Sequence, residues 1–324
     1  ATAEVASLNE ELLAISKSTG LYLDQTTQLA AAWKATGVQS NEEVLALTDL
    51  TAKLSLLTQG EIDQAGAMEL VRSVMRTWGL TVDQTQAQME KLALVASETS
   101  LTMGEIAQAI PLASSAAQLL GIDASQLAAV LSGFREKGIS ATQSANALRV
   151  SLSKLVNPTQ TVVDSWTHLT KIIPELQKFK GTSLTDFLYN ADGTAKGAEG
   201  LVSMAKSIFA EGVLTQRQSA TFLAQVFGAR QFSNMDKLFK SLNDSSSQLS
   251  RSLADVASSA KASAVWGNQL AVVQDSAAFA ATQMRVEFSA IMATLGATIW
   301  PYVEKIGRVL LDIMNKFANA SEVT

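Results

Sequence analysis

The first half of the chain is divided by a recurring pair, a glycine followed by an aliphatic residue, and no other feature constrains the fold as strongly. A glycine just past a helix tolerates the left-handed backbone of the C′ position, and the next apolar side chain folds back onto the last turn. A residue type that caps helix N-termini follows each pair. The sequence therefore predicts short helices joined by tight turns. The pairs are Gly20-Leu21, Gly37-Val38, Gly79-Leu80, Gly121-Ile122 and Gly138-Ile139, and the expected caps are Asp24, Ser40 or Asn41, Asp83, Asp123 and Ser140.

Three of these glycines are evenly spaced. Gly37, Gly79 and Gly121 lie 42 positions apart, which is the length of a two-helix unit. The matching tripeptides Gly60-Glu61-Ile62 and Gly104-Glu105-Ile106 lie between them at a similar interval. A divergent helical-hairpin repeat explains this spacing, but so does the ordinary use of glycine at helix ends. Both interpretations stay open.

Apolar residues recur at helical spacing in these segments, and no strand is predicted. One such stripe contains Leu148, Leu152 and Leu155, in a helix that Asn157-Pro158 ends. Pro111 lies inside an otherwise helical stretch and is expected to kink or split it. Further on, Tyr189 to Gly193 form a strong turn signal.

These patterns predict an all-α fold of short helical hairpins followed by a long C-terminal helix, assembling as a multi-copy helical bundle. Residues 1–158 form a helical core with hairpin-like repeats, and residues 159–245 form shorter helices and turns. Residues 246–324 form a long helical segment, with helix formers dominating from about Leu253 onward.

Composition excludes several classes of function. Nearly half of the residues are apolar (47%) but only 6% are aromatic, so Ala and Leu supply most of the core. The net charge is −5 and no cluster of Lys and Arg is present, which argues against sequence-specific nucleic acid binding. Without cysteine the chain has neither disulfides nor thiolate metal ligands. It begins at Ala1 in mid-pattern, and we interpret it as an excerpt of a longer protein.

Candidate catalytic and metal-binding groups have plainer explanations. His168 is the only histidine, so no histidine cluster is available for zinc. The pairs Glu10-Glu11 and Glu42-Glu43 are adjacent on helices and point in different directions. Asn190 to Gly193 resemble the start of a calcium loop, but the later ligands do not follow in register. We therefore expect no enzyme activity, no metal and no cofactor.

An uncharged run from Phe288 to Val303 lies near the end of the chain. It is shorter than the roughly 20 residues that span a bilayer. Its small residues favour a helix packed against other copies, whereas Trp300 and Tyr302 favour a conditional membrane segment. The candidate residues for either role are Ile291, Gly296, Ile299, Trp300 and Pro301.

Several segments, in this order, resemble the core region of phage tail tape-measure proteins. The resemblance extends from about Leu21 to Ala320, and each motif alone is a helix cap or a small-residue packing site. One departure is Asn146-Ala147, where the family usually has a glycine-rich step. The segments are Leu101 to Ile110, Gly121-Ile122-Asp123, Gly138 to Arg149, Leu155 to Pro158, Asp192-Gly193, Val226 to Arg230, Trp266-Gly267 and Leu295-Gly296 to Trp300-Pro301.

The resemblance implies a virion protein that occupies the tail-tube lumen or the tail tip. Such a protein sets the length of the tube and is expelled before the DNA during genome ejection. Its implied partners are tail-tube and tail-tip proteins, and three or six copies of itself. The host inner membrane is a further implied partner during ejection, which would place the chain in the host envelope at that stage.

Two other functions stay open from the sequence. One is a membrane-perturbing or pore-forming helical protein that acts through residues 277–320, and the other is a helical scaffold that binds a peptide. For a structural assembly protein, the functional residues are packing residues at helix turns. We predict Gly79, Gly121, Gly138, Phe227 and Gly228 for this role.

Overall fold

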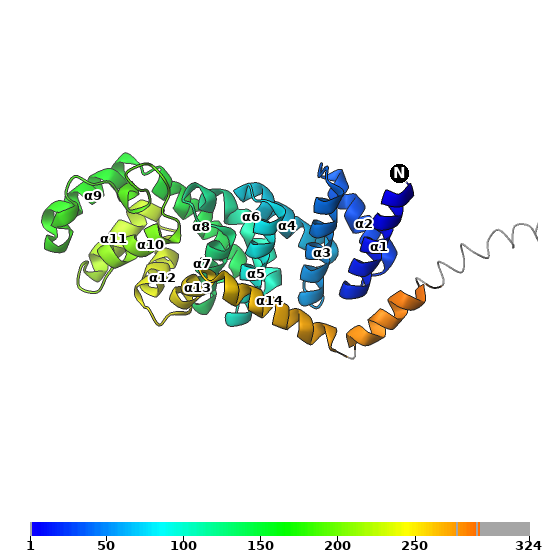
Figure 1. Ribbon diagram of the computed structural model, residues 1–324. Helices are drawn as coiled ribbons and strands as arrows, with labels where there is room; N and C mark the ends of the chain where they lie inside the picture. Colours follow the sequence, from blue (N-terminus) through cyan, green and yellow to red (C-terminus); the bar gives the residue numbers. More distant parts are fainter. Residues whose placement is uncertain (1, 277, 290, 292–324) are drawn as a thin grey trace, which may run out of the picture. The chain divides into compact units, whose positions relative to one another are not determined.

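Helices form most of the computed structural model, which describes residues 2–276, 278–289 and 291 (Figure 1). Within this described part no strand occurs, and the β-type pairing found there is an isolated bridge between Tyr189 and Ala195. The predicted all-α fold is confirmed. The contacts divide the chain into two compact units, one made from residues up to Ala52 and from Val272 onward, the other from Lys53 to Ala271. The predicted regions 1–158, 159–245 and 246–324 stay a prediction.

The first unit combines helices from the start of the chain with described residues that follow Val272. It contains α1 (Thr2–Thr19), α2 (Leu23–Ala35), most of α3 (Asn41–Leu57) and the helical residues 278–289. The side-chain amides of Gln274 and Gln283 donate hydrogen bonds to the carbonyls of Ser18 (2.8 Å) and Lys17 (3.1 Å). These carbonyls lie at the end of α1, where no intrahelical donor reaches them. The C-terminal segment therefore caps the first helix of the chain.

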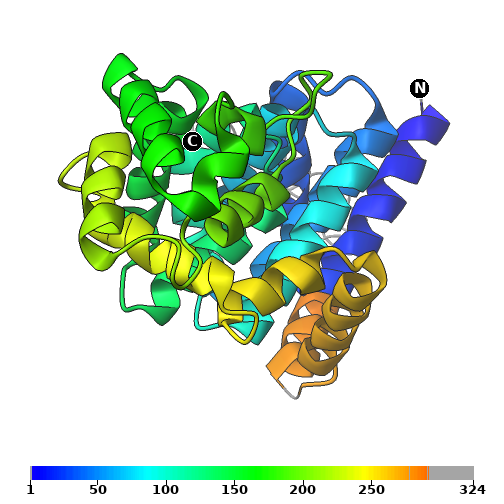
Figure 2. The same cartoon turned by 90° about the vertical axis from the view of Figure 1, so that its left-hand side faces the viewer.

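The second unit is a stack of helices, seen from the side of α9 in Figure 2. In chain order it contains α4 (Gln64–Trp78), α5 (Val82–Glu98), α6 (Met103–Leu119), α7 (Ala124–Glu136), α8 (Ala141–Val156), α9 (Gln160–Ile172), the 3₁₀ turns η1 (Pro174–Phe179) and η2 (Leu184–Phe187), α10 (Ala198–Ile208), α11 (Gln216–Phe227), α12 (Phe232–Asn243), α13 (Gln248–Val256) and most of α14 (Ser259–Gln274).

The contact between α6 and α8 is the most extensive helix–helix contact of this unit. Both helices present small side chains to the core, so their backbones approach closely. The buried small residues are Ala109, Ala113, Ala116 and Ala117 on α6, and Ala141, Ser144, Ala145, Ala147 and Ser151 on α8. This packing accounts for a large apolar fraction with few aromatic residues.

Side-chain caps begin most of these helices. Asp123 and Ser140 accept hydrogen bonds from the backbone N–H groups of Gln126 and Gln143, as predicted. At α5 the prediction was wrong, because Thr81 is the cap and Asp83 lies inside the first turn. Threonine precedes the helix there with an extended backbone, which is the geometry that a cap requires. At α2 the N-cap is Tyr22 rather than Asp24.

Of the two expected effects of Pro111, a kink or a split, the split does not occur, since α6 continues from Met103 to Leu119. Ile110 and Ala113 beside it are fully buried and hold the helix in place. Another local expectation differs from the structure. The expected long helix from Leu253 is interrupted between α13 and α14. There the Ser258 hydroxyl accepts a hydrogen bond from the N–H of Lys261 and starts a new helix.

The two matching tripeptides of the sequence are not equivalent in the structure. Gly60 has a φ of +93° in the turn before α4, whereas Gly104 lies in the first turn of α6. The tripeptides are instead in contact, since the Glu61 carboxylate accepts a hydrogen bond from the N–H of Gly104 at 3.2 Å. A carboxylate at this position also interacts favourably with the helix dipole of α6.

Candidate functional site

The predicted turn glycines lie in different surroundings. Gly79 (φ +62°) and Gly138 (φ +77°) both adopt the left-handed conformation, and an added Cβ at either would meet no atom within 4 Å. Gly121 (φ +69°) is different, because its Cβ would lie 3.0 Å from Cβ of Ala195 and 3.3 Å from its carbonyl oxygen. Of these three positions, only that of Gly121 has another segment so close that it leaves little room for a side chain.

The residues around Gly121, from Leu119 to Ile122, form what we call the α6–α7 turn. Their carbonyls accept hydrogen bonds from three distant groups: the Tyr189 hydroxyl donates to Leu119 (3.1 Å), the Gly197 N–H to Leu120 (2.9 Å), and the Trp78 indole N–H to Ile122 (2.9 Å). Carbonyls at a helix C-terminus lack intrahelical donors, so each bond satisfies an otherwise unpaired acceptor. The turn thereby joins α4, α6 and the segment that precedes α10.

The segment that reaches this turn, residues 189–197, contains several hydrogen bonds of its own. The N–H of Asn190 donates to the carbonyl of Thr194 at 2.8 Å, and the predicted turn is confirmed. Hydrogen bonds from the Thr194 hydroxyl and N–H lower the pKa of Asp192. Among the described residues, no group of acidic or histidine side chains could hold a metal ion. The turn thus positions Tyr189 and Gly197 against the α6–α7 turn.

Phe227 and Gly228 form a second junction, at the end of α11. The Lys154 ammonium at the end of α8 donates a hydrogen bond to the Phe227 carbonyl at 3.0 Å. A Cβ at Gly228 (φ +86°) would lie 3.0 Å from the same ammonium nitrogen. The Phe227 ring is buried and lies 5.9 Å from that of Phe239, centroid to centroid. This corner therefore links α8, α11 and α12.

Aromatic rings from five helical elements, and from Phe209 at the C-cap of α10, form a continuous cluster that the sequence did not predict. Phe209 and Phe239 are stacked, with centroids 4.5 Å apart and planes 15° apart. The overall aromatic content is low, but seven of the eleven phenylalanines lie between positions 179 and 239. This local enrichment could have predicted an aromatic cluster. The cluster comprises Trp166, Phe179, Phe187, Phe209, Phe222, Phe227 and Phe239.

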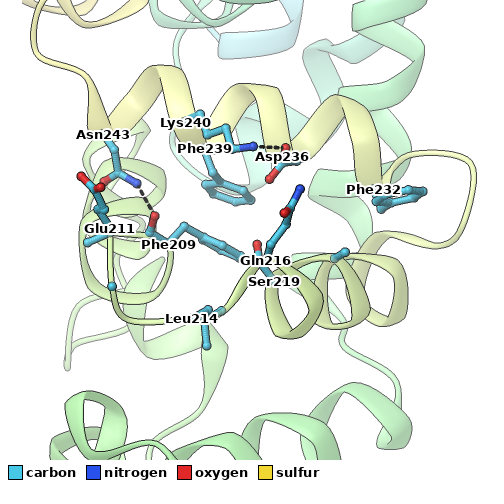
Figure 3. Close-up of a pocket in the computed structure, with 13 residues that line it drawn as sticks. Phe209, Glu211, Leu214, Gln216, Ser219, Phe232, Asp236, Phe239, Lys240 and Asn243 are labelled. Carbon is cyan, nitrogen blue, oxygen red and sulfur yellow. Dashed lines mark hydrogen bonds and ion pairs between the residues drawn. The ribbon is translucent and has the colours of Figure 1, made fainter.

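A pocket of about 470 Å³ opens beside this cluster, between α12 and the start of α11 (Figure 3). The rings of Phe209 and Phe239 line it, and an ion pair between Lys240 and Asp236 (2.7 Å) lies at its edge. The Asn243 amide donates to the carbonyl of Phe209 at 2.9 Å. The pocket offers apolar contact to a ligand, and two of its charged groups, Lys240 and Asp236, are already paired with each other.

The remaining candidates do not come together into a site. His168 is an exposed residue of α9, and Glu42 and Glu43 lie in the first turn of α3. Of the proposed C-terminal helix residues, Ile291 is helical and 55% exposed, whereas Gly296, Ile299, Trp300 and Pro301 lie outside the described residues. In the part of the chain that the structure describes, no helix is both long enough and apolar enough to cross a membrane.

Substitution of the two contrasting glycines tests the role of the α6–α7 turn. Both Gly121→Ala and Gly138→Ala introduce left-handed strain of about 1–2 kcal/mol. Gly121→Ala also forces a Cβ against Ala195, and overpacking of this kind costs a further amount of about 1–3 kcal/mol. Urea unfolding followed by circular dichroism measures both losses, and equal losses in the two variants would show that the contact with Ala195 contributes nothing.

Comparison with known proteins identifies the family of this helical chain. A model of the phage-related minor tail protein family matches residues 9–228, from α1 to the Phe227-Gly228 corner. Neither the search of curated proteins nor that of solved structures found a match. The matched region covers more than half of the chain and includes the α6–α7 turn, with the three residues that donate hydrogen bonds to it, and the Phe227-Gly228 pair. The chain therefore belongs to the phage-related minor tail protein family.

Proposed function

We propose that the chain is part of a tape-measure protein, the protein that sets the length of the phage tail tube. In this proposal it occupies the tube lumen or the tail tip, contacts tube and tip proteins and further copies of itself, and leaves before the DNA at ejection. Membership of a minor tail protein family supports a structural role in the phage tail. The tape-measure role is the finer step that we add.

The observation that carries this step is the high helical content of the described residues, in which turns join successive helices and only the stretch between α9 and α10 lacks an α-helix. A helix advances about 1.5 Å per residue, so a chain whose helices are aligned end to end converts residue number into length. Three of the turns that would have to open lie at Gly37, Gly79 and Gly138, where no other atom approaches the position of a Cβ. The compact form is then one state of a segment that rearranges.

A deletion tests the length-setting role directly. Removal of residues 80–121 joins Gly79 to Ile122, which keeps a glycine-aliphatic pair at the new turn and removes α5 and α6. At 1.5 Å per residue we expect tails shortened by about 60 Å, measured by electron microscopy of virions. Replacing the deleted residues with an unrelated helical sequence of equal length is the control and should restore the tail. Tails of normal length in the deletion would refute the ruler and leave only a structural tail role.

Exposed apolar side chains favour a second candidate, membrane perturbation through residues 277–320. Met284, Phe288 and Ile291 are 66%, 65% and 55% exposed and follow one another at helical spacing. Such a face binds the boundary between headgroups and acyl chains.

We expect the whole chain to release dye from phospholipid vesicles, and we expect the double substitution Met284→Glu and Phe288→Glu to abolish this release. Val163→Glu, at an exposed site on α9, is the control; absence of release by the unmodified chain would eliminate this candidate.

A further inference from the structure

Helices α9 and α11 lie side by side in the second unit (Figure 1). Side chains of both helices line a groove between them. It has a volume of about 560 Å³, within the range of sites that bind ligands. One face of each helix lines it. We call it the α9–α11 groove, and its residues are Asp164, Ser165, His168, Leu169 and Ile172 of α9, and Thr215, Arg217, Gln218, Thr221, Phe222 and Gln225 at and within α11.

The floor of the groove is apolar and well supported. Leu169 and Phe222 form it and are 8% and 3% exposed. The Phe222 ring lies 6.2 Å from Trp166 within the aromatic cluster, which holds the floor in place. Ile172 stands at the edge and is 52% exposed, although it is a large aliphatic residue. The groove therefore presents a preformed surface for an apolar side chain.

The wall formed by α11 is rich in hydrogen-bond donors. Arg217 is exposed and, within the described residues, forms no ion pair. It lies in the first turn of α11, where the positive end of the helix dipole also favours an anion. The Gln218 side-chain oxygen already accepts from Thr215, which leaves its NH₂ group as a donor. The acid of the groove, Asp164, accepts a hydrogen bond from Gln160 at 2.9 Å.

We propose that the α9–α11 groove binds an amphipathic helix of a partner protein that carries acidic side chains beside its apolar face. Two helices with an apolar floor between them accept a third helix in the groove. Acidic side chains on the flank that faces α11 complement the unpaired Arg217 and the donors of that helix, whereas basic ones there would repel Arg217. The one acid of the groove, Asp164, lies on the opposite wall, on α9. This inference is independent of the tape-measure proposal.

Two synthetic peptides test the proposal. Each has about 16 residues, which is long enough for a helix to form. Both carry leucines along one helical face, and the other positions are glutamate in one peptide and lysine in the other. Fluorescence anisotropy with the whole chain should show tighter binding of the glutamate peptide, by up to about fivefold, which is the largest shift that one exposed ion pair gives. Arg217→Glu should reverse this preference, and Ile172→Ser should weaken binding of the glutamate peptide.

Both substituted side chains are exposed, so the fold should persist, and Lys206→Glu on α10 is the matched charge control that should change nothing. Several results would overturn the proposal. They are no binding of the glutamate peptide at about 1 mM, equal binding of both peptides, or no effect of Arg217→Glu. Self-association that Ile172→Ser abolishes would assign the groove to a second copy, and binding to anionic vesicles that Arg217→Glu abolishes would assign it to lipid.

Discussion

The carbonyl groups at the end of α6 are the constraint on which the second unit depends. A helix leaves its last carbonyls without donors, and at the α6–α7 turn donors come from Trp78, Tyr189 and Gly197. These residues are far apart in the sequence, so the turn fixes α4 and the start of α10 relative to α6. Gly121 makes this approach possible because a side chain there would meet Ala195. A local feature of the sequence thus controls long-range packing.

Two kinds of core follow from this junction. On one side α6 and α8 pack through alanine and serine, which brings their backbones close together. On the other side rings such as Trp166 and Phe239 fill the wider space between short helices. The aromatic side carries the pocket beside Phe209 and the α9–α11 groove.

Local features could be predicted from the sequence, and tertiary ones could not. The all-α fold and the caps at Asp123 and Ser140 follow from residues close in the chain. Bonds to the α6–α7 turn join positions more than forty residues apart, and no local pattern encodes them. The contact between Glu61 and Gly104 could not be predicted either. Both residues belong to tripeptides of the same sequence, which suggested equivalent positions in a repeat instead of two segments that touch. Family membership gives a structural role in the phage tail, which the residues alone did not.

Hydrogen exchange at the Gly197 amide tests the central claim, that the α6–α7 turn holds distant segments of the second unit together. This amide belongs to a segment between helices, yet it donates to the Leu120 carbonyl at 2.9 Å. If the junction opens only with the whole unit, the Gly197 amide should be protected as strongly as the buried amides of α6, such as that of Ala113. Exchange as fast as in a freely opening loop would contradict the claim.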